Sequence, residues 1–143
     1  MINKFNIRVY GIWLKKHKIL LSHENIDGFQ MVKFPGGGLE FGEGIKDGLR
    51  REFREELRID IHILRHIHTT DSFIRSAFKT NEQVIAVHYL VDSLNEIENY
   101  KIVQPTGVGK ENSHRFKWHD ITPQLEHKLT FEMDREAFRN LNR

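Results

Sequence analysis

The chain has 143 residues, a length typical of one compact domain. It has no cysteine, which excludes disulfide bonds, thiolate metal sites and a cysteine nucleophile. Its 22 basic and 20 acidic residues leave a formal charge of +2, which is too balanced to favour nucleic acid as the main partner. No apolar run approaches the roughly 20 residues of a membrane span, and the N-terminus lacks the apolar core of a signal peptide. We therefore expect a single domain over residues 1–143, located in the cytoplasm, with no membrane partner.

The first third of the chain has the character of β-strands. Ile7 to Leu14 is apolar at both odd and even positions, which predicts a strand covered on both faces. A polar turn at residues 15–18 is expected to separate it from strands at 19–21 and 28–34. Gly36 to Gly38 would be costly inside a helix or strand, so a shaped loop is expected there.

Residues 44–57 predict a helix. Four apolar residues recur every fourth position and form one ridge: Ile45, Leu49, Phe53 and Leu57. Gly48 lies inside this helix, where glycine costs about 1 kcal/mol relative to alanine. Its presence suggests close packing against a neighbouring backbone.

The second half of the chain predicts further strands and a closing helix. The expected strands cover residues 59–64, 67–78, 84–92 and 114–118. A hairpin turn is expected at residues 79–82, a long polar loop at 93–112, a helix start at Thr122 and Pro123, and a last helix at 131–141. Strands on both sides of a central helix predict the α/β class, as a mixed α/β sandwich.

Two histidines on one predicted strand could suggest a metal site. His66 and His68 are two positions apart and would share one face of the strand. No third ligand is apparent near them, so we interpret them as residues of the sheet surface.

Three glutamates carry the clearest chemical signal in the predicted helix. Glu52, Glu55 and Glu56 are spaced i, i+3 and i+4, so they share one helical face and repel one another. A divalent cation would offset that repulsion, and carboxylate oxygens suit Mg²⁺ or Mn²⁺. A solvated acidic surface is the alternative for such a face taken alone, since glutamate is a good helix former.

The segment before this helix is suited to an anion. Gly36 to Gly38 would let backbone amides approach a phosphate closely, and they lead toward a helix N-terminus with its partial positive charge. Glu43 lies just before the helix and could cap it or reach the metal.

The spacing of these residues resembles the Nudix box. That motif consists of Gly, five residues, Glu, seven residues, Arg-Glu, an apolar residue, any residue, Glu-Glu, any residue, Gly and an apolar residue. Gly37, Glu43, Arg51-Glu52 and Glu55-Glu56 occur at the corresponding positions, and the motif ends at Ile59. One position departs from it: Arg58 stands where the family has Gly. Arginine in a left-handed conformation there would cost roughly 1 kcal/mol or more, or the turn must differ.

The resemblance implies a Nudix-like α/β/α sandwich with a mixed β-sheet, and a metal-dependent hydrolase. It implies Glu52, Glu55 and Glu56 as metal ligands, with Glu52 and Glu55 as candidates for catalysis. Arg51 would orient the carboxylates by charge-assisted hydrogen bonds. Gly37, Gly38 and Glu43 would support the box.

A further catalytic glutamate is implied by the likeness to MutT-like members of the family, which place one in a late loop. Gly109-Lys110-Glu111 resembles that site, so Glu111 is the candidate. Glu82, Glu96 and Glu98 remain alternatives.

The reaction that the resemblance implies is cleavage of a phosphoanhydride bond, with Mg²⁺ as cofactor and Mn²⁺ as an alternative. The substrate would be a nucleoside diphosphate linked to another moiety, or a nucleoside triphosphate. Base recognition would come from outside the box, and the aromatic candidates are Phe5, Phe73, Phe116 and Trp118.

Two other functions stay open, together with the oligomeric state. One is a Nudix-like module that senses a nucleotide without turnover, against which the complete set of box glutamates and the absence of an attached DNA-binding segment argue. The other is an enzyme acting on capped RNA, against which the mild charge argues. A homodimer is compatible with the sequence.

Overall fold

The computed structural model describes residues 1–94 and 113–142. These residues form seven strands, two α-helices and two short 3-10 helices: β1 (Lys4–Lys15), β2 (Lys18–Ile26), β3 (Phe29–Lys33), β4 (Gly36–Gly38), α1 (Ile45–Leu57), β5 (Ile61–Thr69), β6 (Glu82–Ser93), β7 (Ser113–Asp120), η2 (Leu125–Lys128), α2 (Glu132–Arg139) and η3 (Asn140–Asn142). Within this part of the chain, no helix is both long and apolar enough to cross a membrane.

The strands form a mixed sheet in the order β3-β2-β1-β6-β5, with β4 paired to β1 and β7 paired to β2. The long pairing of β1 with β6 is parallel and joins residues 4–13 to residues 82–91. The other strand pairs are antiparallel. The mixed sheet predicted from the sequence is confirmed.

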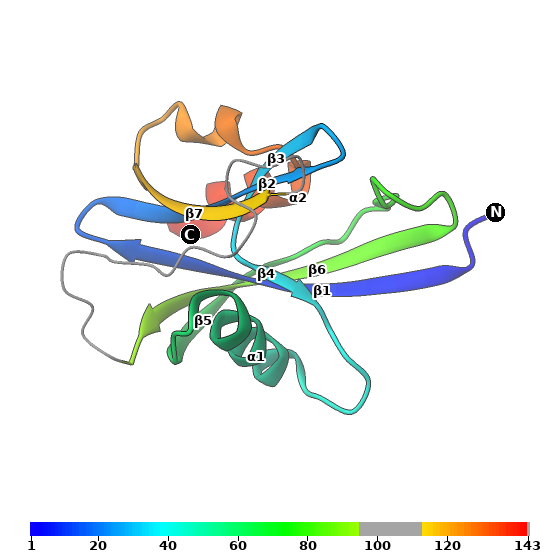
Figure 1. Ribbon diagram of the computed structural model, residues 1–143, viewed down its shortest axis with the longest axis horizontal. Helices are drawn as coiled ribbons and strands as arrows, with labels where there is room; N and C mark the ends of the chain where they lie inside the picture. Colours follow the sequence, from blue (N-terminus) through cyan, green and yellow to red (C-terminus); the bar gives the residue numbers. More distant parts are fainter. Residues whose placement is uncertain (95–112, 143) are drawn as a thin grey trace.

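Helices cover both faces of the sheet. α1 lies on one side of β1 and β6, and the segment from η2 to α2 lies on the other side (Figure 1). The core beneath α1 contains Leu49, Phe53 and Leu57, and the opposite core contains Leu125 and Met133. The α/β/α sandwich is therefore confirmed.

β1 is buried on both faces, as its composition predicts. Val9 and Trp13 belong to the core beneath α1, whereas Tyr10 and Ile12 belong to the core beneath α2. Alternate residues of a strand point to opposite faces, so a strand between two helical layers needs apolar residues at every position. Gly11 interrupts the run because a Cβ there would lie 2.6 Å from the ring of Phe53.

α1 follows the predicted helix within one residue. Leu49, Phe53 and Leu57 of the apolar ridge are buried, and Ile45 at the first turn is more exposed. Gly48 does permit close packing, but its neighbours are side chains: a Cβ would lie 2.7 Å from Leu39 Cδ1 and 3.0 Å from Glu43 Oε1.

The predicted strand over residues 67–78 is wrong beyond Thr69. Residues 70–81 form an irregular connection, held to β6 by a few backbone hydrogen bonds: Thr70 and Ser76 donate to β6, and the carbonyl oxygen of Ile74 accepts from Val84. Hydrogen bonding this sparse leaves side chains free to face the solvent, and Phe73 and Phe78 are both exposed.

Two other local predictions also need correction. Gly36 to Gly38 form the short strand β4 rather than a loop, because glycine allows the backbone to approach β1: a Cβ on Gly36 would lie 2.1 Å from the carbonyl oxygen of Val9. Thr122 and Pro123 do not begin a helix, and the short helix η2 starts at Leu125.

His66 and His68 do not share a face. The register of β5 against β6 shifts between them, as in a β-bulge, which breaks the alternation of side chains. His66 packs edge-on against Tyr89, whereas His68 lies 2.9 Å from Glu136 on α2. The interpretation that they form no joint metal site agrees with this separation.

Arg58 ends α1 in a left-handed conformation, with φ 57° and ψ 40°. Its backbone N–H still donates to the carbonyl of Arg54, and that of Ile59 to Phe53. The turn therefore has the left-handed shape that glycine normally adopts at this position, and arginine adopts it at a steric cost.

We predict that Arg58→Gly stabilises the fold. Removing the left-handed strain of roughly 1–2 kcal/mol is partly offset by the greater freedom of glycine in the unfolded chain, so Tm should rise by about 2–4 °C. Thermal unfolding of the variant measures this shift. Arg58→Ala is the control, since alanine keeps the strain and should give no such gain; an equal rise in both variants would refute the explanation.

A stacked pair of histidines joins β2 to β7. The rings of His23 and His119 lie 5.0 Å apart, and their Nε2 atoms are separated by 2.8 Å. Burial, together with repulsion from His119 and from nearby basic residues, lowers the pKa of His23 to about 4. The folded state therefore favours the neutral form of His23.

This shift predicts a loss of stability in mild acid. The unfolded chain protonates His23 near pH 6.5 and the folded chain only near pH 4, so the free energy of unfolding should fall as pH decreases between these values. His23→Gln should flatten this part of the profile in urea unfolding at successive pH values. The matched control is His62→Gln, which removes an exposed histidine of β5; an unchanged slope in His23→Gln would contradict the assignment.

Candidate functional site

The acidic face of α1 lies against the short strand β4. A Cβ on Gly37 would lie only 2.5 Å from Glu52 Oε1, so the carboxylate of Glu52 rests directly on the backbone of Gly37. The loop from residue 39 to residue 44 then connects β4 to α1. The carboxylate of Glu52 thus occupies space that is open only because residue 37 has no side chain.

Arg51 is the centre of a cluster of carboxylates. Its guanidinium donates to Glu43 at 2.7 Å, to Glu52 at 3.1 Å and to Glu55 at 3.2 Å. It also donates to the carbonyl oxygen of Gly38 at 3.0 Å. These interactions raise the pKa of Arg51 above its ordinary value, and the hydrogen bonds that Arg51 donates to Glu43 contribute most. Arg51 is therefore a permanent cation among acidic side chains.

Glu43 does not cap the helix. α1 has no side-chain cap, and the carboxylate of Glu43 instead accepts hydrogen bonds from Arg51 and from the backbone N–H of Glu40. The bonds from Arg51 and Glu40 hold the pKa of Glu43 below its ordinary value. Glu43 therefore anchors the loop before α1 to the arginine.

Glu52 and Glu56 form a partly buried carboxylate pair on the same face. Burial first, and then the charge and hydrogen bond of Glu52, raise the pKa of Glu56 to about 8. At this pKa the Glu56 carboxyl group keeps its proton at neutral pH when no cation offsets the neighbouring negative charge. This is the electrostatic environment in which a bound cation would be favoured.

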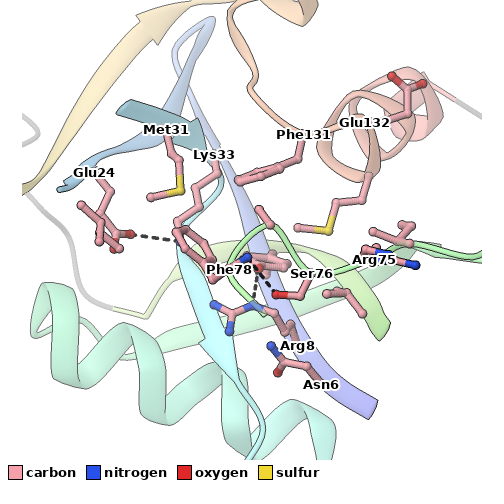
Figure 2. Close-up of a pocket in the computed structure, with 16 residues that line it drawn as sticks. Asn6, Arg8, Glu24, Met31, Lys33, Arg75, Ser76, Phe78, Phe131 and Glu132 are labelled. Carbon is pink, nitrogen blue, oxygen red and sulfur yellow. Dashed lines mark hydrogen bonds and ion pairs between the residues drawn. The ribbon is translucent and has the colours of Figure 1, made fainter. Parts of the chain in front are cut away.

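Two charged residues of the neighbouring strands extend the cluster. Lys33 on β3 forms an ion pair of 3.0 Å with Glu24 on β2 (Figure 2). The charges of Lys33 and Glu24 both act on Glu56, the first favouring and the second opposing its ionised form. No pattern in the sequence pointed to Glu24 and Lys33, because only the folded sheet brings their charges near Glu56.

The predicted ligands are brought together, but they are not arranged as a complete ligand set. In residues 1–94 and 113–142, no three acidic, histidine or cysteine side chains are grouped so that they could hold a metal ion. Glu52 and Glu55 both point to Arg51, and the side chain of Glu55 is largely exposed and free to turn. The donor atoms are all carboxylate oxygens, which suit a hard cation.

The candidates for an additional glutamate separate into two groups. Glu82 begins β6 and lies 3.8 Å from Lys79, with no ion pair or hydrogen bond to the box glutamates within the described residues. Glu111, Glu96 and Glu98 lie outside the described residues, so Glu111 stays a prediction.

The aromatic candidates occupy different environments. Phe116 is buried in the core, and Trp118 packs edge-on against Trp13. Phe5 and Phe73 are exposed, and neither lines the three main pockets formed by residues 1–94 and 113–142. Phe78, which the sequence did not single out as an aromatic candidate, lines a pocket together with Arg8, Lys33 and Phe131.

Comparisons with known proteins agree with this geometry. The sequence matches the family model described as "NUDIX domain" over residues 4–139. Comparison with curated protein sequences gives no match.

Solved structures of NUDIX proteins have the same fold at low sequence identity. A NUDIX hydrolase from Nitrosomonas europaea aligns with a TM-score of 0.71 and 18% identity, over 97% of this chain and 89% of that one. A MutT NUDIX hydrolase from Burkholderia pseudomallei gives 0.71 and 19%, over 97% and 99%. An ADP-ribose pyrophosphatase from Streptococcus suis gives 0.60 and 20%, over 94% and 90%. The family model spans nearly the whole chain and includes the acidic helix, and the chain therefore belongs to the NUDIX family, as its resemblance to a Nudix hydrolase predicted.

Proposed function

We propose that this protein hydrolyses a phosphoanhydride bond with the help of Mg²⁺, or of Mn²⁺ in its place. The substrate is a nucleoside diphosphate linked to another moiety, or a nucleoside triphosphate. The observation that carries the proposal is the partly buried pair of Glu52 and Glu56 on the face of α1 that lies against β4, because a divalent cation would offset the burial and repulsion that raise the pKa of Glu56 to about 8.

The ligands in this proposal are Glu52, Glu55 and Glu56. A bound Mg²⁺ supplies neutralisation of the phosphate oxygens and lowers the pKa of a water molecule. Glu55 would have to leave Arg51 and turn toward the other two, which its exposure allows. Arg51 holds the carboxylates of Glu43 and Glu52 in place during such a change.

The remaining roles belong to groups around the acidic face. Glu52, Glu55 or Glu111 accepts the proton of the attacking water. Lys33 and Arg8 present positive charge near Glu56 and Glu52 and are placed to hold phosphate oxygens. Two structures with a similar fold, an ADP-ribose pyrophosphatase and a UDP-X diphosphatase, support a nucleoside diphosphate derivative as the substrate class.

A non-catalytic nucleotide-binding module is the alternative. It is favoured by one observation, namely that Arg51 engages two of the three expected ligands. The proposed partner is a small nucleotide derivative in either case, rather than a membrane or a nucleic acid, with a cytoplasmic location and a homodimer as further expectations.

A hydrolysis screen tests the proposal. Nucleoside triphosphates, ADP-ribose, nucleotide sugars, dinucleoside polyphosphates and capped RNA are each incubated with the protein in Mg²⁺, Mn²⁺ or EDTA. We expect metal-dependent release of phosphorylated products, at least 100-fold slower in Glu55→Gln/Glu56→Gln because the metal loses two ligands. Asp47→Asn, which removes an exposed carboxylate from the same helix, should stay near the wild-type rate.

Metal binding is followed separately from turnover. Tm of the wild-type protein should rise with Mg²⁺ or Mn²⁺, by an amount that corresponds to about 2.7 kcal/mol at 100 times Kd. The double variant should show no such rise. Metal and nucleotide binding without turnover of any compound would favour the sensing module instead.

The contact between Gly37 and Glu52 gives a sharper prediction. Gly37→Ala should displace the carboxylate of Glu52, because the new Cβ would lie 2.5 Å from Glu52 Oε1. We expect turnover and metal affinity to fall about 10- to 100-fold, the range for groups that orient metal ligands. Tm should change little, since the side chain of Glu52 can move.

Gly38→Ala is the matched control for this substitution. A Cβ on Gly38 meets its nearest atom, Arg8 Nη1, at an ordinary 3.6 Å. Its turnover should stay within about twofold of wild type, in keeping with the small effect of sites without special contacts. Equal losses of turnover and metal affinity in Gly37→Ala and Gly38→Ala would contradict the explanation that Gly37 is needed to keep Glu52 in position.

A further inference from the structure

A pair of polar side chains is buried in the core between the sheet and α2. His88 of β6 and Asp134 in the first turn of α2 are both fully buried, and His88 Nε2 lies 2.7 Å from Asp134 Oδ1. The second polar atom of each side chain, His88 Nδ1 and Asp134 Oδ2, has no hydrogen-bond partner among the described residues. Apolar side chains of similar size would fill this space at a smaller cost. The pair therefore indicates a role beyond packing.

His88 connects this pair to the ring of Tyr10 on the neighbouring strand. Tyr10 is paired with His88 in the parallel ladder of β1 and β6, and the two rings stack with centroids 5.1 Å apart. Phe34 packs edge-on against the same histidine. Gly36 of β4 lies close to Tyr10, since a Cβ there would be 2.8 Å from Tyr10 Cδ1. The buried ring of Tyr10 is therefore held on several sides, which fixes the position of its hydroxyl group.

The hydroxyl group of Tyr10 holds the guanidinium of Arg8. Arg8 Nε donates to it at 2.6 Å, and the guanidinium carbon lies 5.6 Å from the centroid of the Tyr10 ring. Arg8 Nη1 lies toward β4, 3.6 Å from the position that a Cβ on Gly38 would take. Arg8 thus extends from β1 to the strand against which Glu52 rests.

The partner of Arg8 is uncharged, in contrast to the partners of Arg51. Arg51 lies within ion-pair distance of four carboxylates, whereas Arg8 has no carboxylate at that distance among the described residues. Burial raises the pKa of Tyr10, so its hydroxyl group stays protonated at neutral pH. A neutral hydroxyl group orients a guanidinium without cancelling its charge. Arg8 is therefore a half-buried cation whose charge is available to an anion.

The surroundings of Arg8 indicate which anion it suits. The charge of Glu52, a proposed metal ligand, acts on Arg8 although the two side chains form no ion pair. A phosphate group bound to a metal ion at Glu52 would therefore lie near Arg8. The planar fork of guanidinium donors matches the spacing of two phosphate oxygens, provided that the fork is held in the correct orientation.

We propose that Tyr10, His88 and Asp134 are positioning residues, which hold Arg8 where it binds the phosphate oxygens of the substrate. Asp134 fixes the ring of His88, His88 supports the ring of Tyr10, and the hydroxyl group of Tyr10 orients Arg8. The inference rests on the proposed function, because the phosphoanhydride at the acidic face supplies the anion. α2 thus contributes to the site through the core, from the side of the sheet opposite to α1.

A double-mutant cycle tests the link between Tyr10 and Arg8 without turnover. The probe is imidodiphosphate, which has nitrogen in place of the bridging oxygen, titrated by calorimetry in Mg²⁺. We expect Arg8→Ala to weaken binding about tenfold and Tyr10→Phe, which removes only a hydroxyl group, about fivefold. The combined variant should bind like Arg8→Ala, because Tyr10 acts through Arg8 alone. A purely structural role of Tyr10 would instead make the two losses multiply.

The buried pair is tested with a variant that favours folding. His88→Leu/Asp134→Ala replaces it by apolar side chains of similar total size, so Tm should stay the same or rise. Binding of imidodiphosphate should nevertheless weaken about threefold or more, and not weaken further when Arg8→Ala is added. The matched control is Thr130→Val, which removes the hydrogen bond from the backbone N–H of Val32 to Thr130 Oγ1 just before α2. It should bind the probe like wild type.

Several outcomes would overturn the inference. They are wild-type affinity in Tyr10→Phe, losses that multiply in the combined variants, an equal loss in Thr130→Val, and no binding of imidodiphosphate by the wild-type protein. The expected cycle without hydrolysis of any compound would support the inference and refute the proposed enzyme activity alone. Hydrolysis together with losses that multiply would refute the inference alone.

Discussion

The guanidinium of Arg51 lies within ion-pair distance of four carboxylates, those of Glu40, Glu43, Glu52 and Glu55. These acidic side chains lie close together on one short loop and one helical face. Without a cation between them their repulsion would destabilise the folded state. A planar cation with several fixed donors can serve these carboxylates at once, which lysine cannot do. The loop before α1, the first turns of the helix and the candidate ligands are therefore organised around one side chain.

Close backbone contacts carry this arrangement into the sheet. Gly37 lets β4 approach the carboxylate of Glu52, and Gly11 lets β1 approach the ring of Phe53 one residue later on the same helix. α1 is thus fixed on two adjacent residues, one polar and one apolar. These two contacts set both the depth and the rotation of the helix, and they place Glu52 of its acidic face against β4.

The local parts of the site were predictable from the sequence, and the distant parts were not. α1 and its acidic face follow from a spacing of three and four residues, which is a property of the chain alone. Glu24 and Lys33 act on Glu56 only because β2 and β3 fold back beside the helix. Phe78 was placed at the end of a predicted strand, but residues 70–81 form an irregular connection with few hydrogen bonds, and the ring of Phe78 is exposed. Tertiary contacts of this kind produce no periodic pattern in the sequence from which they could be predicted.

The parallel pairing of β1 with β6 also determines when the site can exist during synthesis. Lys4 pairs with Glu82 and Trp13 with Val91, so the central seam of the sheet closes only after α1 and β5 have left the ribosome. Until then the apolar ridge of α1 lacks much of the surface that buries it in the finished protein, and a short helix without such packing is marginal in water. Closing this seam joins residues far apart in the chain, which makes it a slow step. The acidic helix therefore acquires its final shape late, as a product of sheet closure, and an excised peptide of the box would not retain it.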